Sequence, residues 1–447
     1  MTKFEEHPTV LWWREQAVAK SPVVASIPLN ADALRELCLQ AGADDVGFVE
    51  ISRPAIADQH ADILAAFPRT KTLISFVCRM HKENVRAPLR SIANTEFHAS
   101  GADIDRVGRS IVETLTKIGI RALNPSVAFP QEMDRYPGKV WTVSYKPVAI
   151  AAGLGHMGLH RNVIHPKFGN FILLGAVLIE AEVTEYNYPI DYNPCIDCKL
   201  CVAACPVGAI GMDGHFNFSA CYTHNYREFM GGFTEWAETI ADSKNAREYR
   251  EKYSAAESAS MWQSLSFKAN YKAAYCMAAC PAGEDVIAPF LSDRQGFVRE
   301  VVKPLQDKTE TIYVISGSDA ETYTAKRFPH KTVKPVSSGI RPVSIAGFLF
   351  GLPLLFQRNQ SAGLNAIYHF TFTGSESCDA TITIQNKTLQ VQTGHIGRAD
   401  IAITADSKTW IGFLCKEQNI IWAILRRKIR VSGSIKLLQA FGKCFPS

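Results

Sequence analysis

Residues 195–206 read Cys195-Ile-Asp-Cys198-Lys-Leu-Cys201-Val-Ala-Ala-Cys205-Pro206, and this stretch decides the fold around it. Its spacing, Cys-x2-Cys-x2-Cys-x3-Cys-Pro, is typical of bacterial ferredoxins with two clusters. In these, three thiolates from a tight loop hold one cluster and the fourth cysteine ligates the other. Structural zinc sites use two separated pairs of ligands instead. The stretch therefore predicts iron–sulfur ligation rather than zinc.

The rest of the cysteine-rich segment must supply the missing ligands, and it predicts two 4Fe-4S clusters. Cys280, which precedes Pro281, is the natural fourth ligand of the first cluster. The predicted ligands of the first cluster are Cys195, Cys198, Cys201 and Cys280. Those of the second cluster are Cys205, Cys221 and Cys276.

The second cluster is one cysteine short. Ala273 stands three residues before Cys276, where a complete motif would have another thiolate. Either a non-cysteine group ligates the fourth iron, or the cluster is a three-iron form, or one iron is left open; the candidate groups are Tyr275, His224 and water. An altered electron relay is the simpler interpretation, because ligation mainly tunes the reduction potential.

Composition sets broad limits. The chain has 447 residues, 47% apolar and 20% charged, with a net charge of +5. This is ordinary globular composition, and so mild a charge argues against a dedicated nucleic-acid binder, so no nucleic-acid partner is expected. The start of the chain lacks a basic and apolar leader, which predicts a cytoplasmic protein. The longest apolar run, residues 345–356, is too short for a membrane span.

The order of patterns predicts an α/β (α+β) multidomain chain. Helical patterns at 34–38, 56–67 and 104–118 alternate with strand-like runs at 46–49 and 72–77. The predicted domains are a 1–30 N-terminal arm, a 31–189 α/β core, a 190–290 ferredoxin-like two-cluster module, a 291–339 linker and a 340–447 domain of short alternating strands.

A glycine loop precedes the cysteines. Residues 153–158 formally match the dinucleotide fingerprint G-x-G-x-x-G. That fingerprint needs a full helix after its third glycine, and Pro166 and Gly169 interrupt any such helix. The loop is therefore expected to contact another large, flat or phosphate-bearing cofactor through Gly153, Leu154, Gly155, His156, Met157 and Gly158.

Together, the glycine loop and the cysteine motif resemble epoxyqueuosine reductase and the respiratory reductive dehalogenases, over about residues 31–288. The resemblance implies a nitroreductase-like core that binds cobalamin without a histidine ligand, beside two clusters that feed it electrons. It further implies reduction of a carbon–oxygen or carbon–halogen bond, with a low-potential donor such as ferredoxin or flavodoxin. Two departures stand out: Lys139 occupies the position where the family's proton-donating aspartate is expected, and the second cluster lacks a cysteine.

Proton donors are sought beside the glycine loop. Tyr145 and Lys139 are the predicted catalytic residues, and Lys146 and His160 flank the same loop. A tyrosine or lysine can donate a proton near a cofactor when burial shifts its pKa. For each of these residues, packing or a phosphate contact is the competing interpretation.

Residues 340–447 resemble sterol carrier protein type two domains. The resemblance rests on residues 363–374, 380–384, 389–394, 400–406 and 431–438. It implies a small sheet with helices around an apolar tunnel, and hence a small-molecule substrate that could be lipid-like. A structural or dimerising module with a filled core is the alternative.

Two functions follow from these patterns. The first is an iron–sulfur and cobalamin-dependent reductase of an electrophilic organic substrate, and the C-terminal domain suggests an apolar one. The second is an electron-transfer iron–sulfur protein with a lipid-binding domain and no catalytic corrinoid. An NAD-linked dehydrogenase would rest on the glycine fingerprint alone.

Overall fold

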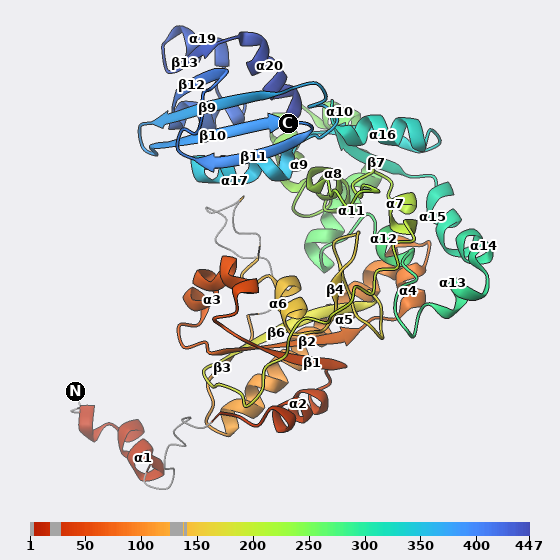
Figure 1. Cartoon of the computed structure of the whole chain (residues 1–447), viewed down its shortest axis with the longest axis vertical. Helices are drawn as coiled ribbons and strands as arrows, with labels where there is room; N and C mark the ends of the chain where they lie inside the picture. The colour runs from red at the N-terminus through yellow and green to blue at the C-terminus, as the bar shows by residue number, and fades with distance from the viewer. Residues whose placement is uncertain (1–3, 18–27, 126–136, 138–140) are drawn as a thin grey trace.

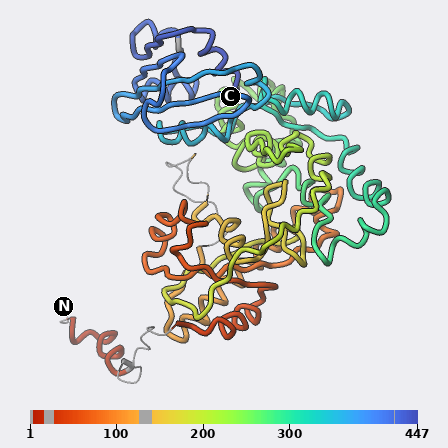
Figure 2. Tube along the Cα trace, in the orientation of Figure 1, coloured from red at the N-terminus to blue at the C-terminus, as the bar shows by residue number. Residues whose placement is uncertain are grey.

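The computed structural model describes residues 4–17, 28–125, 137 and 141–447. Three bodies follow one another along the chain: an α+β core, a helical cysteine-bearing module and a C-terminal sheet domain (Figure 1). The tube trace shows the C-terminal domain at one end of the molecule and the N-terminal helix α1 (Pro8–Ala17) apart from the core at the other (Figure 2). The predicted class, a multidomain chain of mixed helices and strands, is confirmed.

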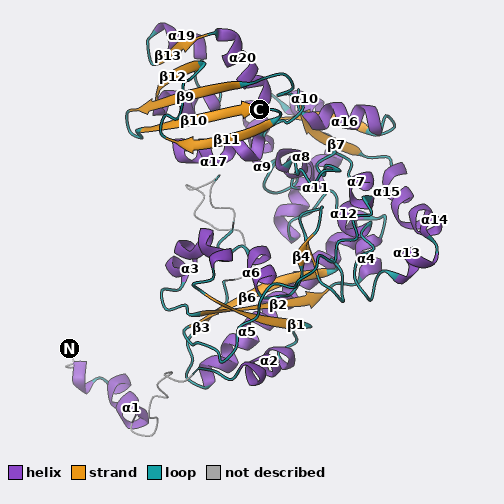
Figure 3. Ribbon diagram, in the orientation of Figure 1, coloured by secondary structure: helices purple, strands orange, loops and turns teal. Residues whose placement is uncertain are grey.

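The core is built on a four-stranded sheet. Its strands are β1 (Asp45–Glu50), β2 (Thr72–Arg79), β6 (Ile172–Ile179) and β3 (Ala122–Leu123), in that order, and every pair is antiparallel. Figure 3 shows helices on either side of these strands. Helices α2 (Ala31–Gln40) and α5 (Arg90–Lys117) cover one face, and α3 (His60–Ala66) and α6 (Tyr145–Ala151) cover the other.

Strand β2 shows why the sequence gives this arrangement. Ile74 and Phe76 pack towards α2 and α5, whereas Leu73 and Val77 pack towards α3 and α6. Alternate side chains of a strand point to opposite faces, so a strand buried on both faces reads as a continuous apolar run. The predicted strands at 46–49 and 72–77 and helices at 34–38 and 104–118 are confirmed within these elements.

The cysteine-bearing module consists of short helices. Helices α7 (Leu200–Ala204), α8 (Phe218–Asn225) and α12 (Tyr275–Ala278) carry or adjoin the cysteines. Between α8 and α12, the chain forms α9 (Phe233–Asp242), α10 (Ala246–Lys252) and α11 (Ala255–Phe267).

Residues 291–339 differ from the predicted linker. They form strands β7 (Thr311–Ile315) and β8 (Thr332–Val336), which pair in parallel, and the connecting helix α16 (Asp319–Arg327). Ile312 and Val314 of β7 are buried in one cluster with Cys201 and Cys205. The polar and proline-bearing composition suggested a linker, but one apolar strand was enough to bind this segment to the module. Helices α13 (Ala288–Ser292), α14 (Arg294–Phe297) and α15 (Lys303–Asp307) lead into it.

The C-terminal domain is a five-stranded sheet covered by helices. The strand order is β11 (Thr388–Thr393), β10 (Cys378–Gln385), β9 (Ala366–Thr373), β12 (Ile401–Asp406) and β13 (Ile429–Gly433), with only β9 and β12 parallel. The helices are α17 (Ile345–Leu355), α18 (Ser407–Leu414), α19 (Ile420–Leu425) and α20 (Ile435–Cys444). Phe348, Phe370 and Trp410 pack ring against ring inside. The interior next to these strands is therefore filled with aromatic side chains.

The remaining elements are the hairpin β4 (His156–Met157) and β5 (Val163–Ile164), helix α4 (Lys82–Arg86) and the short helices at Phe4–Glu6, Pro54–Gln59 and Val298–Val302. Within the described ranges, none of the helices combines the length and the apolar character that crossing a bilayer requires.

Candidate iron–sulfur and cofactor site

The first set of thiols, Cys195, Cys198, Cys201 and Cys280, is gathered mainly by one loop. Asp197 and Lys199 have φ of +53° and +62° there, a left-handed conformation that costs non-glycine residues about 1–3 kcal/mol. Cys280 follows α12 and packs against Cys195. Burial raises the pKa of the Cys280 thiol, and the three loop thiols raise it further. The structure thus brings together the four residues predicted for the first cluster.

The second set, Cys205, Cys221 and Cys276, comes from three separate segments. Cys205 ends the ferredoxin-like loop, Cys221 lies on α8 and Cys276 on α12. Burial, and then the nearby Cys221 and Cys205 thiols, raises the pKa of Cys276 to about 12. The Sγ atom of Cys205 also accepts a hydrogen bond from the backbone N–H of Ala209 at 3.3 Å. The structure therefore brings these three thiols together as well.

The two sets are neighbours. Burial raises the pKa of Cys201 to about 12, and among the thiols Cys276 of the second set contributes most to that shift. Cys201 and Cys205 are also buried in one cluster of side chains, with Cys221 and Cys276 packed against it, so the sets adjoin at Cys201. In the described part of the chain, no three His, Cys, Asp or Glu side chains are arranged to hold a single metal ion.

Of the two protein candidates for the fourth ligand of the second cluster, Tyr275 is engaged elsewhere, whereas His224 keeps one ring nitrogen without a hydrogen-bond partner. The hydroxyl of Tyr275 donates a hydrogen bond to Glu310 Oε2 at 2.7 Å. The Nδ1 atom of His224 accepts one from the N–H of Tyr313 at 3.3 Å, while its Nε2 is buried without a partner. The cations nearest His224 include Lys272 and Lys331, whereas Lys146 is the cation beside Cys221. His224 lies one turn after Cys221 on α8, so its role as the fourth ligand stays a prediction.

The glycine loop ends helix α6 and begins the β4–β5 hairpin. Gly153 and Gly155 have φ of +74° and +152°. A Cβ atom on Gly153 would lie 2.6 Å from the carbonyl oxygen of Tyr188, and one on Gly155 would lie 2.3 Å from that of Ile164. The close packing of this chain's own backbone therefore requires both glycines, whether or not a cofactor binds. Leu154 is buried, whereas His156 and Met157 remain partly exposed on the hairpin.

The predicted proton donors lie at the start of α6 and just before it. Burial, with Asp105 nearby, raises the pKa of Tyr145, so this phenol keeps its proton at neutral pH. Lys139 lies outside the described residues. His160 is buried within the hairpin turn, and burial, with Lys146 nearby, lowers its pKa to about 4. His160 is therefore neutral at physiological pH.

Lys146 joins the glycine-loop hairpin to the second set of thiols. Its Nζ atom donates hydrogen bonds to the carbonyl oxygen of Arg161 at 2.6 Å and to Asn162 Oδ1 at 3.2 Å. Burial lowers the pKa of Lys146, and the Cys276 and Cys221 thiols oppose that shift. Of the residues that flank the loop, Lys146 is thus the one that links the hairpin electrostatically to the second set.

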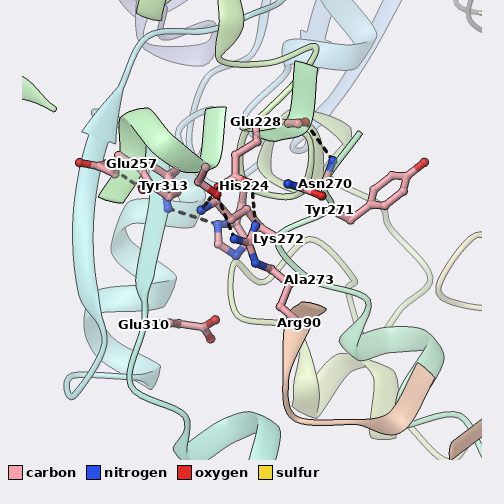
Figure 4. Close-up of polar contacts among 12 residues, drawn as sticks. Arg90, His224, Glu228, Glu257, Asn270, Tyr271, Lys272, Ala273, Glu310 and Tyr313 are labelled. Carbon is pink, nitrogen blue, oxygen red and sulfur yellow. Dashed lines mark hydrogen bonds and ion pairs between the residues drawn. The ribbon is translucent and has the colours of Figure 1, made fainter. Parts of the chain in front are cut away.

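A buried charge network, which the sequence analysis did not single out, holds together the segments that carry Cys221 and Cys276. Glu228 Oε2 lies 2.6 Å from Arg90, and its other oxygen accepts hydrogen bonds from Lys272 and, at 2.6 Å, from Ser260 (Figure 4). Burial raises the pKa of Glu228, but Lys272 and Arg90 outweigh it, so that the pKa lies below its usual value. Glu228 is therefore a buried carboxylate held between two cations.

This network fixes α8 and α12 relative to each other. Asn225, at the end of α8, accepts hydrogen bonds from the backbone N–H groups of Lys272 and Ala273, just before Cys276. Asn94 of α5 exchanges two hydrogen bonds with the backbone of Tyr271. Glu228 has its partners far away in the sequence, in α5 and in the segment before α12, and no local pattern signals such pairs.

A cavity of about 510 Å³ opens elsewhere, at the end of strand β2. It is lined by Arg79, Met80, His81, Lys82, Glu83, Asn84, Phe168, Phe171, Asp285 and Val286. No thiol of either set and no residue of the glycine loop lines it.

Comparisons with known proteins agree with these features. Residues 188–211 match the 4Fe-4S binding domain, and residues 355–446 match the SCP-2 sterol transfer family. The epoxyqueuosine reductase of Cellulophaga algicola is 30% identical over 241 residues, which cover 47% of this chain and 74% of that protein.

Two solved structures are similar to parts of the chain. A catabolic reductive dehalogenase, NpRdhA, has 15% identity and a TM-score of 0.38 over 64% of this chain and 36% of its own. An epoxyqueuosine reductase solved with an epoxyqueuosine-modified tRNA-Tyr stem loop has 16% identity and a TM-score of 0.30 over 43% of this chain and 56% of its own.

The expectation that no nucleic acid is involved is wrong. It rested on the mild net charge of the whole chain, and it is overturned because the family to which the long curated match points, the epoxyqueuosine reductases, has a member that was solved with a tRNA stem loop. Net charge averages over the entire surface, so it cannot exclude a local site for RNA.

The C-terminal domain matches the sterol transfer family, and the cysteine-rich loop matches the 4Fe-4S family. The match to the epoxyqueuosine reductase of Cellulophaga algicola is longer than both together, since it covers 47% of the chain. This chain is an iron–sulfur oxidoreductase that belongs to the epoxyqueuosine reductase family.

Proposed function

We propose that the chain is a cytoplasmic reductase that holds two iron–sulfur clusters and cobalamin and reduces an electrophilic carbon centre. The observation that carries this proposal is the succession of sites: the first set of thiols adjoins the second, and Lys146 joins the second to the glycine-loop hairpin. Such a succession suits single-electron transfer from one cluster to the next and on to a cofactor at the hairpin.

The residues present fit iron–sulfur clusters. The donors are thiols, gathered as one set of four and one of three, with backbone N–H groups directed at Cys205. Hydrogen bonds to cluster sulfurs are among the features by which proteins tune reduction potential. Cys195, Cys198, Cys201 and Cys280 would hold the first cluster, and Cys205, Cys221 and Cys276 the second.

The hairpin also suits cobalamin. Because Gly153 and Gly155 are already packed against the chain's own carbonyls, a cofactor would contact the partly exposed His156 and Met157 and the exposed Lys146. Cobalamin, when bound, supplies a strongly reducing metal centre. Lys146 would hold the hairpin in place through Arg161, and Tyr145 would keep a proton ready for the reduced substrate.

The name of the Cellulophaga relative gives the first substrate to test, epoxyqueuosine, and the solved relative contains it on a tRNA stem loop. The sterol-carrier-like domain favours a second class, an apolar electrophile. Lys139 stands in place of the expected aspartate. Comparing the turnover of these two substrate classes tests which of them the chain with this lysine reduces.

The experiment is anaerobic purification of the full chain from cobalamin-supplemented cells, followed by assays of iron, sulfide and cobalt. Reduced flavodoxin then serves as the electron donor, with an epoxyqueuosine-modified stem loop as substrate. We expect iron for two clusters, cobalt in stoichiometric amount and conversion to queuosine. Cys378→Ala, in the C-terminal sheet, is the control variant that should change none of these.

A protein with full iron but no cobalt, even after cobalamin is added, would overturn the reductase proposal. The three-thiol second set favours the alternative in that case, an electron-transfer protein joined to a lipid-binding domain. If the protein binds cobalt but does not convert the stem loop, apolar electrophiles are the substrates to test next.

A further inference from the structure

The C-terminal domain exposes an apolar helix at its outer end. In α19, Ile421, Trp422 and Leu425 are 65%, 61% and 66% exposed, and Ile424 is 40% exposed. Ala423 of the same helix is buried against the domain's core. Figure 1 places α19 at the end of the domain that lies away from the four-stranded core sheet. Helices at such positions usually show polar side chains to water, so this apolar face calls for a partner.

Cations surround this face. Arg426, Arg427, Lys428 and Arg430 follow directly, and all four are exposed. None of them forms an ion pair with an acid in the described part of the chain. From Gln418 to Ser447 the sequence contains six Lys or Arg residues and no Asp or Glu. The guanidinium of Arg426 lies 5.9 Å from the centre of the Trp422 ring, so the charge and the aromatic face are presented together.

We propose that α19 and the cations after it form a docking surface for an anionic lipid bilayer. An apolar face bordered by Lys and Arg inserts shallowly between head groups while its cations contact the lipid phosphates. A tryptophan beside an arginine suits that interface, because its ring is apolar and its N–H stays in contact with polar groups.

Other occupants fit less well. RNA would use the cations and the Trp422 ring, but the other three exposed side chains of the face, Ile421, Ile424 and Leu425, offer neither a stacking surface nor a hydrogen bond to a base. A second copy of the chain would place like charges opposite one another, which opposes association. The α19 face therefore predicts that the protein binds a membrane. This inference goes beyond the proposed reductase activity and does not depend on it.

The test is flotation of the full-length protein with vesicles of phosphatidylcholine, with and without phosphatidylglycerol. We expect binding only to the anionic vesicles and release by high salt, since salt screens exposed charges. Trp422→Ser with Leu425→Ser, and separately Arg426→Gln with Arg427→Gln, should each lower the bound fraction at least about tenfold.

Two matched controls keep the test specific. Trp262→Ser with Leu265→Ser removes an equally exposed pair from α11, and Arg247→Gln with Arg250→Gln removes two exposed arginines from α10. Both should bind vesicles like the unaltered protein, and all four variants should keep its iron content and melting temperature. Equal binding by the α19 variants and their controls would overturn the proposal. So would charge-dependent binding to tRNA without vesicle binding, or a loss of self-association as the only effect of the α19 changes.

Discussion

The two sets of thiols are assembled in different ways. Three thiols of the first set come from seven consecutive residues, 195–201, and only Cys280 arrives from a distance. The second set takes one thiol from each of three segments, and Asn225 and the Glu228 network hold together the two that carry Cys221 and Cys276. A local loop can thus form one site almost alone, whereas the other depends on long-range contacts. The first set should therefore tolerate damage to the surrounding module better than the second.

Removing one thiol from each set gives the largest expected effects. Cys201→Ala removes the thiol at which the sets adjoin, so we expect loss of about half of the iron and a fall in donor-driven reduction of at least about a hundredfold. Cys276→Ala should leave the first cluster in place. The iron that remains in this variant should then give the electron paramagnetic resonance spectrum of a single type of cluster. Iron analysis and electron paramagnetic resonance measure both.

The same pair of variants can contradict the claim that the first set forms without the second. Cys378→Ala and Cys415→Ala, in the C-terminal domain, serve as controls and should retain all iron. If Cys276→Ala lost both clusters while Cys201→Ala lost one, the first set would not be the self-sufficient one.

Neutralising Glu228 in the buried network has the next largest expected effect. Glu228→Gln leaves Arg90 and Lys272 without their buried counter-charge, and breaking such a pair costs about 3–5 kcal/mol. We expect the melting temperature of the cysteine-bearing module to fall by about 5–15 °C, with the second cluster lost before the first. Loss of visible absorbance on heating follows the clusters.

Glu251→Gln is the matched control, because Glu251 is exposed and only faces Arg247 on the same helix. Its melting temperature should stay within about 1 °C of the unaltered protein, as expected for a surface ion pair. Equal losses of the two clusters in Glu228→Gln would show that the network supports the whole module.

Acid should weaken the same region through His224. Burial, with Lys272 and other cations nearby, lowers the pKa of His224 to about 3, compared with about 6.5 in unfolded chains. Between these two pKa values the imidazole of His224 binds a proton in the unfolded state but not in the folded state. The free energy of unfolding therefore falls as the pH drops through 6.5. From about pH 7 to about pH 5.5 the expected loss is about 1.2 kcal/mol.

Hydrogen exchange of the Tyr313 amide, which donates to His224, reads out this local stability. In His224→Asn the side-chain oxygen can still accept that hydrogen bond but does not titrate. The protection of Tyr313 should then be independent of pH over this range, after correction for intrinsic exchange rates. A pH dependence that survives the substitution would assign it to another group, such as His160.

The comparison also explains what the sequence could predict. The spacing of residues 195–206 is local chemistry, so it predicted two sets of cysteines, and the structure gathers the members of each set. Strand β7 was missed because its five residues lie inside a polar, proline-bearing stretch. The Glu228 network was missed because its partners lie in α5 and near α12, and only the folded chain brings them together. The glycines were interpreted as a cofactor cradle, yet the carbonyls of Tyr188 and Ile164 already require them.

Lys146 offers the finest test of the difference between the sets, since it lies beside the second and is bonded to the hairpin. A nearby positive charge stabilises the more negative, reduced cluster, so Lys146→Met should lower the potential of the second cluster by a few tens of millivolts and leave the first unchanged. Asn162→Ala removes one of the hydrogen bonds of Lys146 but keeps its charge, and separates the electrostatic effect from a loosened hairpin. A redox titration followed by electron paramagnetic resonance measures both potentials. If the two variants shift the potential of the second cluster equally, Lys146 acts by holding the hairpin in place. If Lys146→Met shifts the potentials of both clusters equally, its charge does not act on the second cluster alone.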